Sequence, residues 1–379
     1  MSRPTYAEID LAAIRHNLRV LRSRLGPGVR VLGVVKADGY GHGAEQVAQA
    51  LVRPGGGGDP GIDMLGVAIV EEGVALRVAG VGVPILVMGL APADELAAAL
   101  AYRLTLTVDG PATAEPIARL AARRGVRMPV HLKVDTGMNR LGVRAEEAVE
   151  AARALAASPH LDLEGLYTHL ACADVPDGGT TDRQLAAFRA VVEALAAEGI
   201  RPRLLHAANS SALLGRPDSH FNLVRPGLAL YGVRPGGARG EVDLRPALAL
   251  KSRVVALKRV RPGEGVSYSH RWRAQRESLV GVVPVGYADG YPWALSERAS
   301  VRVAGRLAPV VGAVCMDMTM VDLTDVPGAG PGAEVTLIET DPQSPLSAAA
   351  LAEQAGTIPY EILTGIGKRV PRRHIWGEG

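Results

Sequence analysis

The sequence of 379 residues predicts an α/β protein: an N-terminal (β/α)8 barrel of the TIM type, followed by a mostly β domain. From about residue 30 to 230, short apolar runs alternate with alanine-rich helical stretches, and after that the helical stretches almost vanish. Eight strand–helix units in about 200 residues favour a closed barrel, with a doubly wound open sheet as the alternative. We therefore expect a barrel domain over residues 1–234 and a β domain over residues 235–379.

Each expected strand is a short apolar run bounded by turn residues. The barrel strands are expected at Val31–Val35, Met64–Ile69, Ile85–Met88, Leu104–Val108, Val130–Val134, Leu163–Thr168, Leu204–Ala207 and Asn222–Val224. Helices are expected at Ala44–Val52, Glu71–Val78, Pro92–Ala101, Pro111–Arg124, Ala145–Ala157 and Thr181–Ala197. The β domain is expected to contain strands at Leu248–Val260, Leu279–Pro284, Val301–Val303, Met318–Leu323 and Val335–Ile338, and a helix at Ser347–Ala355. Gly55–Gly58 is interpreted as a flexible loop.

The composition argues against several classes of function. The 42 basic and 39 acidic residues give a net charge of +3, and no basic tract indicates a nucleic-acid surface. The sequence has neither the apolar core of a signal peptide nor a run of about eighteen apolar residues, so a cytoplasmic protein without a membrane span is expected. Cys172 and Cys315 lie far apart and form no metal-binding or disulfide pattern.

The stretch Val31–Gly43 carries the first chemical signal. Its apolar run ends at Lys36, and the following loop has three glycines, which allow a backbone to approach a ligand closely. At the rim of a core, desolvation favours the neutral amine that Schiff-base chemistry requires. The stretch by itself slightly favours the simpler interpretation, a lysine that extends from a strand end into solvent.

Other reactive side chains follow later strands of the predicted barrel. They are Asp135 and Arg140, His169, Asn209 and Ser210, and Arg225. Because strand ends converge on one face of a barrel, these side chains are expected to gather there. For His169, contact with a cofactor ring or a role as a base competes with the commoner buried core histidine.

Arg225, Gly227, Leu228 and Ser210 predict an anion site at the end of the last two strands. Arginine presents a fixed fork of donors, and barrel enzymes often bind phosphate near the loops after strands seven and eight. A structural arginine–carboxylate pair is the alternative. Together with Lys36, the pattern favours pyridoxal phosphate, a cofactor held as a Schiff base.

Two further positions allow a structural as well as a functional interpretation. Lys133 shares a strand face with His131 and Asp135, because side chains alternate along a strand, and a salt bridge to Asp135 would explain it. Tyr287 lies in a tight loop of the second domain, where its hydroxyl could simply cap a backbone carbonyl.

Taken together, these motifs resemble one family. Val34–Gly43 resembles the pyridoxal-phosphate signature of bacterial alanine racemases, although Asp38-Gly39 stands where the family often has Asn-Ala. Further resemblances follow in the family's order and span most of the chain: residues 133–142, 206–210, 224–232, 285–290, 314–317 and 359–364, the last with Pro359 at a variable position. The first motif is shared with related decarboxylases, whereas the whole set is specific to racemases.

The resemblance implies a homodimer that interconverts L-alanine and D-alanine with pyridoxal 5′-phosphate and supplies D-alanine for peptidoglycan synthesis. It implies that Lys36 forms the internal aldimine and acts as the base on the D-alanine side. Tyr287 from the partner subunit would be the base on the L-alanine side, in a site shared between subunits.

The resemblance also implies the binding residues, and it implies no metal. Tyr40, His169, Asn209, Ser210, Arg225, Gly227, Leu228 and Tyr360 would bind the cofactor, with Arg225 on the pyridine nitrogen. Arg140, Met316 and Asp317 would bind the substrate, and a carbamylated Lys133 would orient Arg140. Two alternatives are a pyridoxal-dependent amino-acid decarboxylase of the same architecture and a non-enzymatic pyridoxal-phosphate-binding protein.

Overall fold

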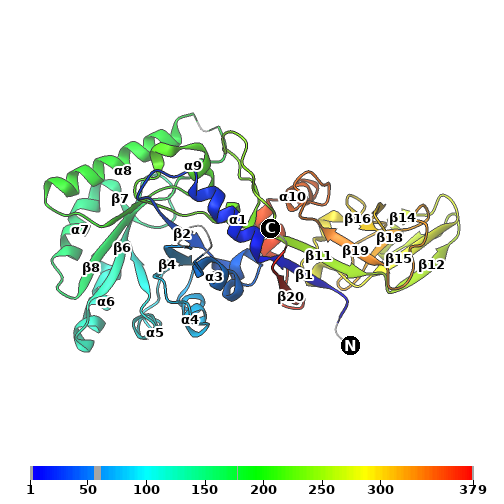
Figure 1. Ribbon diagram of the computed structural model, residues 1–379, viewed down its shortest axis with the longest axis horizontal. Helices are drawn as coiled ribbons and strands as arrows, with labels where there is room; N and C mark the ends of the chain where they lie inside the picture. The colour runs from blue at the N-terminus through cyan, green and yellow to red at the C-terminus, as the bar shows by residue number, and fades with distance from the viewer. Residues whose placement is uncertain (1–2, 55–60, 177, 378–379) are drawn as a thin grey trace.

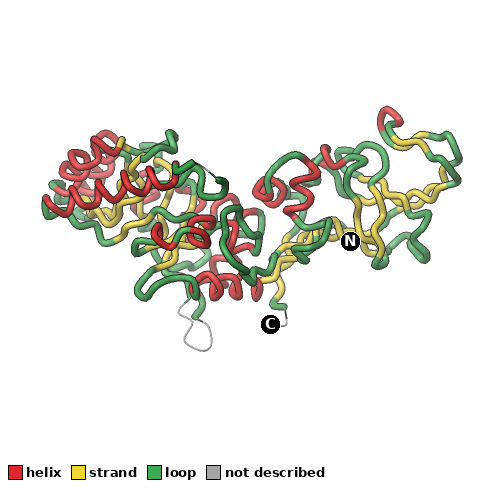
Figure 2. The backbone as a smooth tube through the Cα atoms, turned by 90° about the horizontal axis from the view of Figure 1, so that it is seen from above, coloured by secondary structure: helices red, strands yellow, loops and turns green. Residues whose placement is uncertain are grey.

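The structure is a computed structural model that describes residues 3–54, 61–176 and 178–377, so the predicted loop Gly55–Gly58 lies outside the described residues. Figure 1 shows two lobes, a barrel wrapped by helices at the left and a mostly β lobe at the right. Figure 2 shows the same two lobes end to end, seen from above. Within the described ranges, no helix has both the length and the apolarity needed to cross a membrane.

The first lobe is a nearly closed barrel of parallel strands, as predicted. Its hydrogen-bonded order is β10-β2-β3-β4-β5-β6-β8-β9, with the short β7 beside β6. The strands are β2 (Arg30–Val34), β3 (Met64–Val67), β4 (Ile85–Leu90), β5 (Thr105–Val108), β6 (Met128–Asp135), β7 (Val143–Arg144), β8 (Leu161–Tyr167), β9 (Leu204–His206) and β10 (Leu223–Val224). Backbone hydrogen bonds from Asn222 N to Leu205 O and from Arg225 N to Ala208 O link the two ends of this order. An open sheet is therefore the wrong alternative.

The helices of the barrel lobe follow its strands, and their apolar faces pack on the barrel. They are α2 (Lys36–Tyr40), α3 (Ala44–Val52), α4 (Val70–Val78), α5 (Leu96–Ala101), α6 (Pro111–Arg124), α7 (Ala148–Ala156), α8 (Thr180–Ala197) and α9 (Ser210–Gly215). In α6, for example, the buried side chains are Ala114, Ile117 and Ala121, which recur at helical spacing. The helix predicted from Pro92 begins only at Leu96, after a turn in which Glu95 N donates to Pro92 O.

The first strand and helix of the chain are absent from the predicted set. β1 (Tyr6–Asp10) pairs antiparallel with β11 (Leu248–Arg253) and parallel with β20 (Arg372–Ile375). Both ends of the described chain therefore lie in one sheet of the second lobe. α1 (Leu11–Arg22) follows, and its N-cap Asp10 accepts hydrogen bonds from the first turn. The boundary between the predicted domains, between residues 234 and 235, stays a prediction.

The second lobe is mostly β. It contains a sheet in the order β17-β16-β19-β11-β1-β20, a sheet in the order β12-β15-β18, and the pair β13-β14. The remaining elements are β12 (Ala256–Val260), β13 (Gly265–Val266), β14 (Trp272–Arg273), β15 (Ser278–Val283), β16 (Ser300–Val303), β17 (Arg306–Pro309), β18 (Thr319–Asp322), β19 (Glu334–Ile338), α10 (Ala348–Ala355) and α11 (Pro359–Thr364). The prediction of one strand over Leu248–Val260 is wrong. β11 and β12 join different sheets, because Val254 N donates to Ala333 O and Val255 N to Val282 O.

The loop after β2 has an unusual backbone that the second lobe holds in place. From its second residue onward, α2 is a single left-handed turn with φ between 52° and 60°. Outside glycine this conformation costs about 1–2 kcal/mol per residue. Arg372 Nε donates to Gly41 O at 3.0 Å, and His374 Nε2 lies 2.8 Å from His42 O. β20 therefore stabilises the loop that carries the lysine.

Candidate active site

A cavity of about 630 Å³ lies at the C-terminal end of the barrel strands. It is lined by every predicted site residue except Tyr287, Met316 and Asp317: Lys36, Tyr40, Lys133, Arg140, His169, Asn209, Ser210, Arg225, Gly227, Leu228 and Tyr360. All but Tyr360 follow or end barrel strands, which is where parallel strands converge. Among the described residues, no cluster of three His, Cys, Asp or Glu side chains could hold a metal.

Two lysines and two arginines give the cavity a positive charge. Burial lowers the pKa of Lys36, and the neighbouring charge of Arg140 lowers it further. Lys133 is 5% exposed, and burial together with Arg140 lowers its pKa to about 8. Both amines therefore lose their protons more readily than a lysine in water, and a neutral amine is the nucleophilic form.

Asp135 does not form the salt bridge with Lys133 that the sequence allows. Its Oδ1 accepts the backbone N–H groups of residues 137–139, at 2.9, 2.9 and 3.1 Å. This turn leads directly to Arg140 at the cavity wall. Lys133 Nζ lies 5.6 Å from the centroid of the Tyr167 ring. The carboxylate thus organises a loop and leaves the ammonium without an ion partner among the described residues.

Arg225 directly follows β10 and is 2% exposed. Its Nη1 donates to His206 Nδ1 at 2.9 Å, and its Nη2 donates to Thr168 O at 2.8 Å and Ala207 O at 3.1 Å. No carboxylate of the described chain pairs with it, so the structural arginine–carboxylate alternative is wrong. Burial lowers its pKa to about 10, which leaves it charged at neutral pH. Its Nε–H is buried without a partner in the described residues, a free donor on a cavity-lining side chain.

Two other predicted binding residues also have structural partners. His169 Nδ1 lies 3.3 Å from Arg225 Nη2, and burial together with this cation lowers the pKa of His169 to about 3. The imidazole is therefore neutral. Asn209 is the N-cap of α9, where its Oδ1 accepts Ala212 N at 3.0 Å. Leu228 lies beside them in the cavity wall.

Hydroxyl groups and a glycine form another part of the cavity wall. Ser210 Oγ accepts Gly227 N at 2.9 Å and Ala229 N at 3.3 Å. A Cβ at position 227 would lie 2.4 Å from Tyr40 Oη, so glycine is required for this phenol to stay in place. The Tyr40 and Tyr360 rings lie 5.8 Å apart, and burial raises the pKa of both phenols. They therefore remain protonated donors, suited to an anionic group.

Tyr287, Met316 and Asp317 lie in the second lobe, away from this cavity. Tyr287 N donates to Cys315 O and Ala288 N donates to Met316 O, each at 3.0 Å, so their two loops run side by side. Tyr287 is 45% exposed and Met316 is 52% exposed. A single chain therefore does not bring the predicted second base to the barrel.

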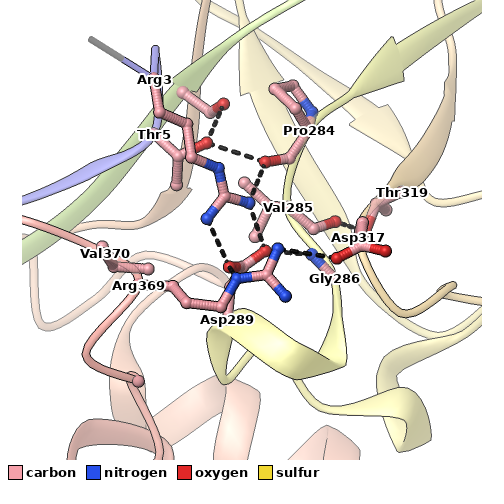
Figure 3. Close-up of polar contacts among 12 residues, drawn as sticks. Arg3, Thr5, Pro284, Val285, Gly286, Asp289, Asp317, Thr319, Arg369 and Val370 are labelled. Carbon is pink, nitrogen blue, oxygen red and sulfur yellow. Dashed lines mark hydrogen bonds and ion pairs between the residues drawn. The ribbon is translucent and has the colours of Figure 1, made fainter.

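Figure 3 shows how the loop of Tyr287 is held. Arg3 Nη1 and Nη2 donate to the two carboxylate oxygens of the fully buried Asp289, each at 2.5 Å. Arg369 Nε lies 3.4 Å from Asp289 Oδ1, while its Nη2 donates to Asp317 at 2.7 Å. Burial alone would raise the pKa of Asp289, but the contact with Arg3 outweighs it and the pKa is lowered. Segments from both ends of the chain thus fix the loop.

A second exposed phenol, Tyr268, was not among the predicted site residues. It is 73% exposed and lies between Ser267, with φ of 64°, and Ser269, with φ of 60°. Strained backbone of this kind clusters at functional sites. Ser267 Oγ donates to Ala313 O, so this loop flanks the same segment as the Tyr287 loop. Its sequence signal is a tyrosine between two serines in a glycine-containing turn.

Three fully buried polar residues behind the cavity are also absent from the predicted site. His131, Tyr167 and His206 are at most 1% exposed, and Tyr167 lines the cavity. The rings of Tyr167 and His206 stack at 4.7 Å with an interplanar angle of 2°. Each residue interrupts an apolar barrel strand, and this is the signal that could have found them.

The fold and the cavity define a barrel enzyme with a lysine of lowered pKa after its first strand and a buried guanidinium after its eighth. Comparisons with known proteins identify its family. Residues 9–235 match the family model of the alanine racemase N-terminal domain, and residues 247–374 match that of the C-terminal domain. Alanine racemase of Desulfovibrio desulfuricans is 43% identical over 374 residues, and that of Sorangium cellulosum 44% over 381; each match covers 98% of both chains.

Solved structures agree with this assignment. Alanine racemase of Clostridium difficile 630 superposes with a TM-score of 0.92 at 35% identity, over 99% of this chain and 96% of that one. The enzyme of Streptomyces coelicolor gives a TM-score of 0.91 at 40% identity, over 98% of each chain. The chain belongs to the alanine racemase family, whose members are isomerases that depend on pyridoxal phosphate.

We predict that Arg3→Ala destabilises the second lobe by about 2 kcal/mol, less than for a fully buried pair because Arg3 is partly exposed and Arg369 remains. Urea titration followed by tryptophan fluorescence measures this, since Trp272, Trp293 and Trp376 all lie in that lobe. Because the pKa of Asp289 is lowered in the folded chain, its contribution to stability is complete above the unfolded pKa of about 4, and the difference from wild type should narrow as the pH falls from there through the lower folded-state pKa.

Arg276→Ala is the matched control, because the Arg276–Asp325 pair is exposed on both sides. It should change stability by less than about 0.5 kcal/mol. An Arg3→Ala chain as stable as this control would contradict the role of the clamp. Adding Asp289→Asn to Arg3→Ala should restore part of the loss, because it removes a buried charge that has lost its nearest partner.

Proposed function

We propose that the protein interconverts L-alanine and D-alanine with pyridoxal 5′-phosphate bound in the barrel cavity, and that two copies of the chain share each site. One observation carries the proposal: the cavity unites Lys36 and Arg225 with a set of hydroxyl donors, yet its own phenols are held protonated by burial. With Lys133 converted to a carbamate, as proposed below, the base for the opposite face of the substrate would come from elsewhere. The D-alanine formed would serve peptidoglycan synthesis, a role that rests on family membership alone.

The residues of the cavity fit the cofactor. The Nε–H of Arg225, which has no partner in the described residues, suits an acceptor nitrogen, and the missing side chain of Gly227 leaves room for the hydroxyl of Tyr40, a donor for phosphate. Lys36 would hold the aldehyde carbon covalently, and Ser210 and Tyr360 would help to hold the phosphate. When bound, pyridoxal phosphate withdraws electrons from the substrate and makes its α-proton acidic.

The chain's own residues would move the proton and hold the substrate. The lowered pKa of Lys36 provides a neutral amine that can take the α-proton on one face. Arg140 would bind the substrate carboxylate, with Met316 and Asp317 of the partner subunit. Arg225 only donates, so it would keep the ring nitrogen unprotonated and limit side reactions.

The base for the opposite face would be an exposed phenol on the second lobe of the partner subunit. The sequence resemblance supports Tyr287. Tyr268 is a more exposed candidate, which its strained loop also supports. Both flank the segment that ends at Met316, so either could enter a site shared between two copies.

The first test follows optical rotation. L-alanine incubated with the protein and pyridoxal phosphate should lose its rotation completely, because a racemase reaches an equal mixture of enantiomers. The amount of alanine should stay constant. Lys36→Ala should leave the rotation unchanged. Release of carbon dioxide would support the decarboxylase alternative, and stable rotation with bound cofactor would support the binding protein.

The second test concerns the shared site. Lys36→Ala chains are unfolded and refolded in equal mixture with Tyr287→Phe chains and, separately, with Tyr268→Phe chains. If a phenol acts as the base, its Phe variant should be inactive alone. Mixed with Lys36→Ala chains, that variant should recover about a quarter of wild-type activity, because half of the dimers are mixed and each mixed dimer has one intact site out of two. If mixed dimers form and neither mixture recovers activity, the shared site is wrong.

The third test concerns carbamylation of Lys133, which we propose because its lowered pKa provides neutral amine and the carbamate anion would pair with Arg140. After incubation with ¹³C-bicarbonate near pH 8, the ¹³C NMR spectrum should show one carbamate signal that Lys133→Arg abolishes. Lys251→Arg is the control. Burial alone would lower the pKa of Lys251, but its ion pair with Glu8 raises it. A signal that persists in Lys133→Arg would contradict the assignment.

A further inference from the structure

A row of polar side chains runs through the barrel interior from the cavity to the opposite end. His206 Nδ1 lies 2.9 Å from Arg225 Nη1, and His206 Nε2 lies 2.9 Å from His131 Nδ1. His131 Nε2 lies at an ion-pair distance of 3.4 Å from Glu164 Oε2, outside hydrogen-bond geometry, and has no other polar partner among the described residues. Glu164 is the middle residue of β8 and contacts Arg203, just before β9, so the row ends toward the N-terminal end of the strands.

The proton positions along this row follow from Arg225. A guanidinium only donates, so His206 Nδ1 must accept and the ring proton of His206 lies on Nε2. His206 Nε2–H then donates to His131 Nδ1, which places the proton of His131 on Nε2, facing Glu164. Burial lowers the pKa of both histidines, so each ring is neutral and carries one proton. The cation Arg225 at one end and the anion Glu164 at the other therefore favour a single arrangement of the two ring protons.

The barrel is packed to accommodate these rings. His131 on β6 is paired with Gly165 on β8, where a Cβ would lie 2.5 Å from His131 Nδ1. His206 stacks on Tyr167, and both histidines are fully buried. Buried polar groups are costly unless they are hydrogen-bonded, and apolar side chains could fill the same interior. The arrangement therefore indicates a role beyond packing.

We propose that Glu164 is a positioning residue that acts through His131 and His206 on Arg225. The relay keeps an acceptor facing Arg225 Nη1 and so holds the guanidinium with its Nε–H free for the ligand. If either ring adopted its other tautomer, two N–H groups would face each other and the guanidinium would have to move. This inference rests on the proposed function, in which that Nε–H donates to the ring nitrogen of pyridoxal phosphate.

The test compares three substitutions at the N-terminal end of the barrel strands. Glu164→Leu removes the acceptor, whereas Glu164→Gln keeps an acceptor oxygen on a side chain of the same size. Asp162→Asn is the matched control. Asp162 also lies on β8 and binds Arg203 at 2.7 Å, but it has no hydrogen bond to either histidine in the described chain.

The first readout is the ¹⁵N-histidine NMR spectrum of the cofactor-free chain. Wild type, Glu164→Gln and Asp162→Asn should show His131 and His206 protonated on Nε2 only. Glu164→Leu should add a second set of signals with protonated Nδ1. This readout distinguishes a relay from a general effect of the Glu164 charge on stability. If Glu164 only stabilised the fold, its removal would not change the tautomer of His206.

The second readout is the Kd for pyridoxal phosphate, measured by absorbance titration. Glu164→Leu should raise this Kd about tenfold, as does the loss of a hydrogen-bond partner behind a metal-ligating histidine. The Kd of the other two variants should stay near that of wild type. Unchanged tautomers in Glu164→Leu, or an equal loss in Asp162→Asn, would overturn the relay. If Glu164→Leu shows the tautomer change but the wild-type chain does not racemise alanine, the proposed function is contradicted and the relay stands.

Discussion

A cluster of positive charge that forms no salt bridge with a carboxylate among the described residues is the constraint on which the site depends. Lys36, Lys133, Arg140 and Arg225 face one cavity, and the nearby carboxylate of Asp135 is used to fold a loop. Desolvation lowers the pKa of both lysines and of Arg225, because burial disfavours the charged form. The cavity can therefore provide neutral amines and can also bind anionic groups such as a phosphate or an amino-acid carboxylate.

The second lobe also supports the barrel cavity of its own chain. β20 holds the left-handed turn after Lys36 through Arg372 and His374, and α11 places Tyr360 in the barrel cavity. These contacts stabilise the unfavourable left-handed backbone, and they come from a segment more than three hundred residues away in sequence. The ends of the chain also clamp the loop of Tyr287, so one lobe supports two separate groups of site residues.

The barrel strands could be predicted because each is a short apolar run between turn signals, and parallel strands impose a common direction on their ends. β1 could not be assigned to the second lobe, because its partners β11 and β20 lie far away along the chain. The break between β11 and β12 is also invisible in sequence, since Val254 and Val255 continue the apolar run. Only the backbone partners of these two valines show that the strand changes sheets.

The sequence by itself predicted which groups are candidates for the chemistry and that most of them gather at one end of a barrel, because periodicity and strand direction are local properties. It could not determine the partners of these groups. The tertiary structure decided that Arg225 faces His206 and not a carboxylate, that Tyr360 enters the cavity and that Tyr287 does not. These facts depend on how distant segments pack, and long-range packing is set by complementary surfaces that no single stretch of sequence contains.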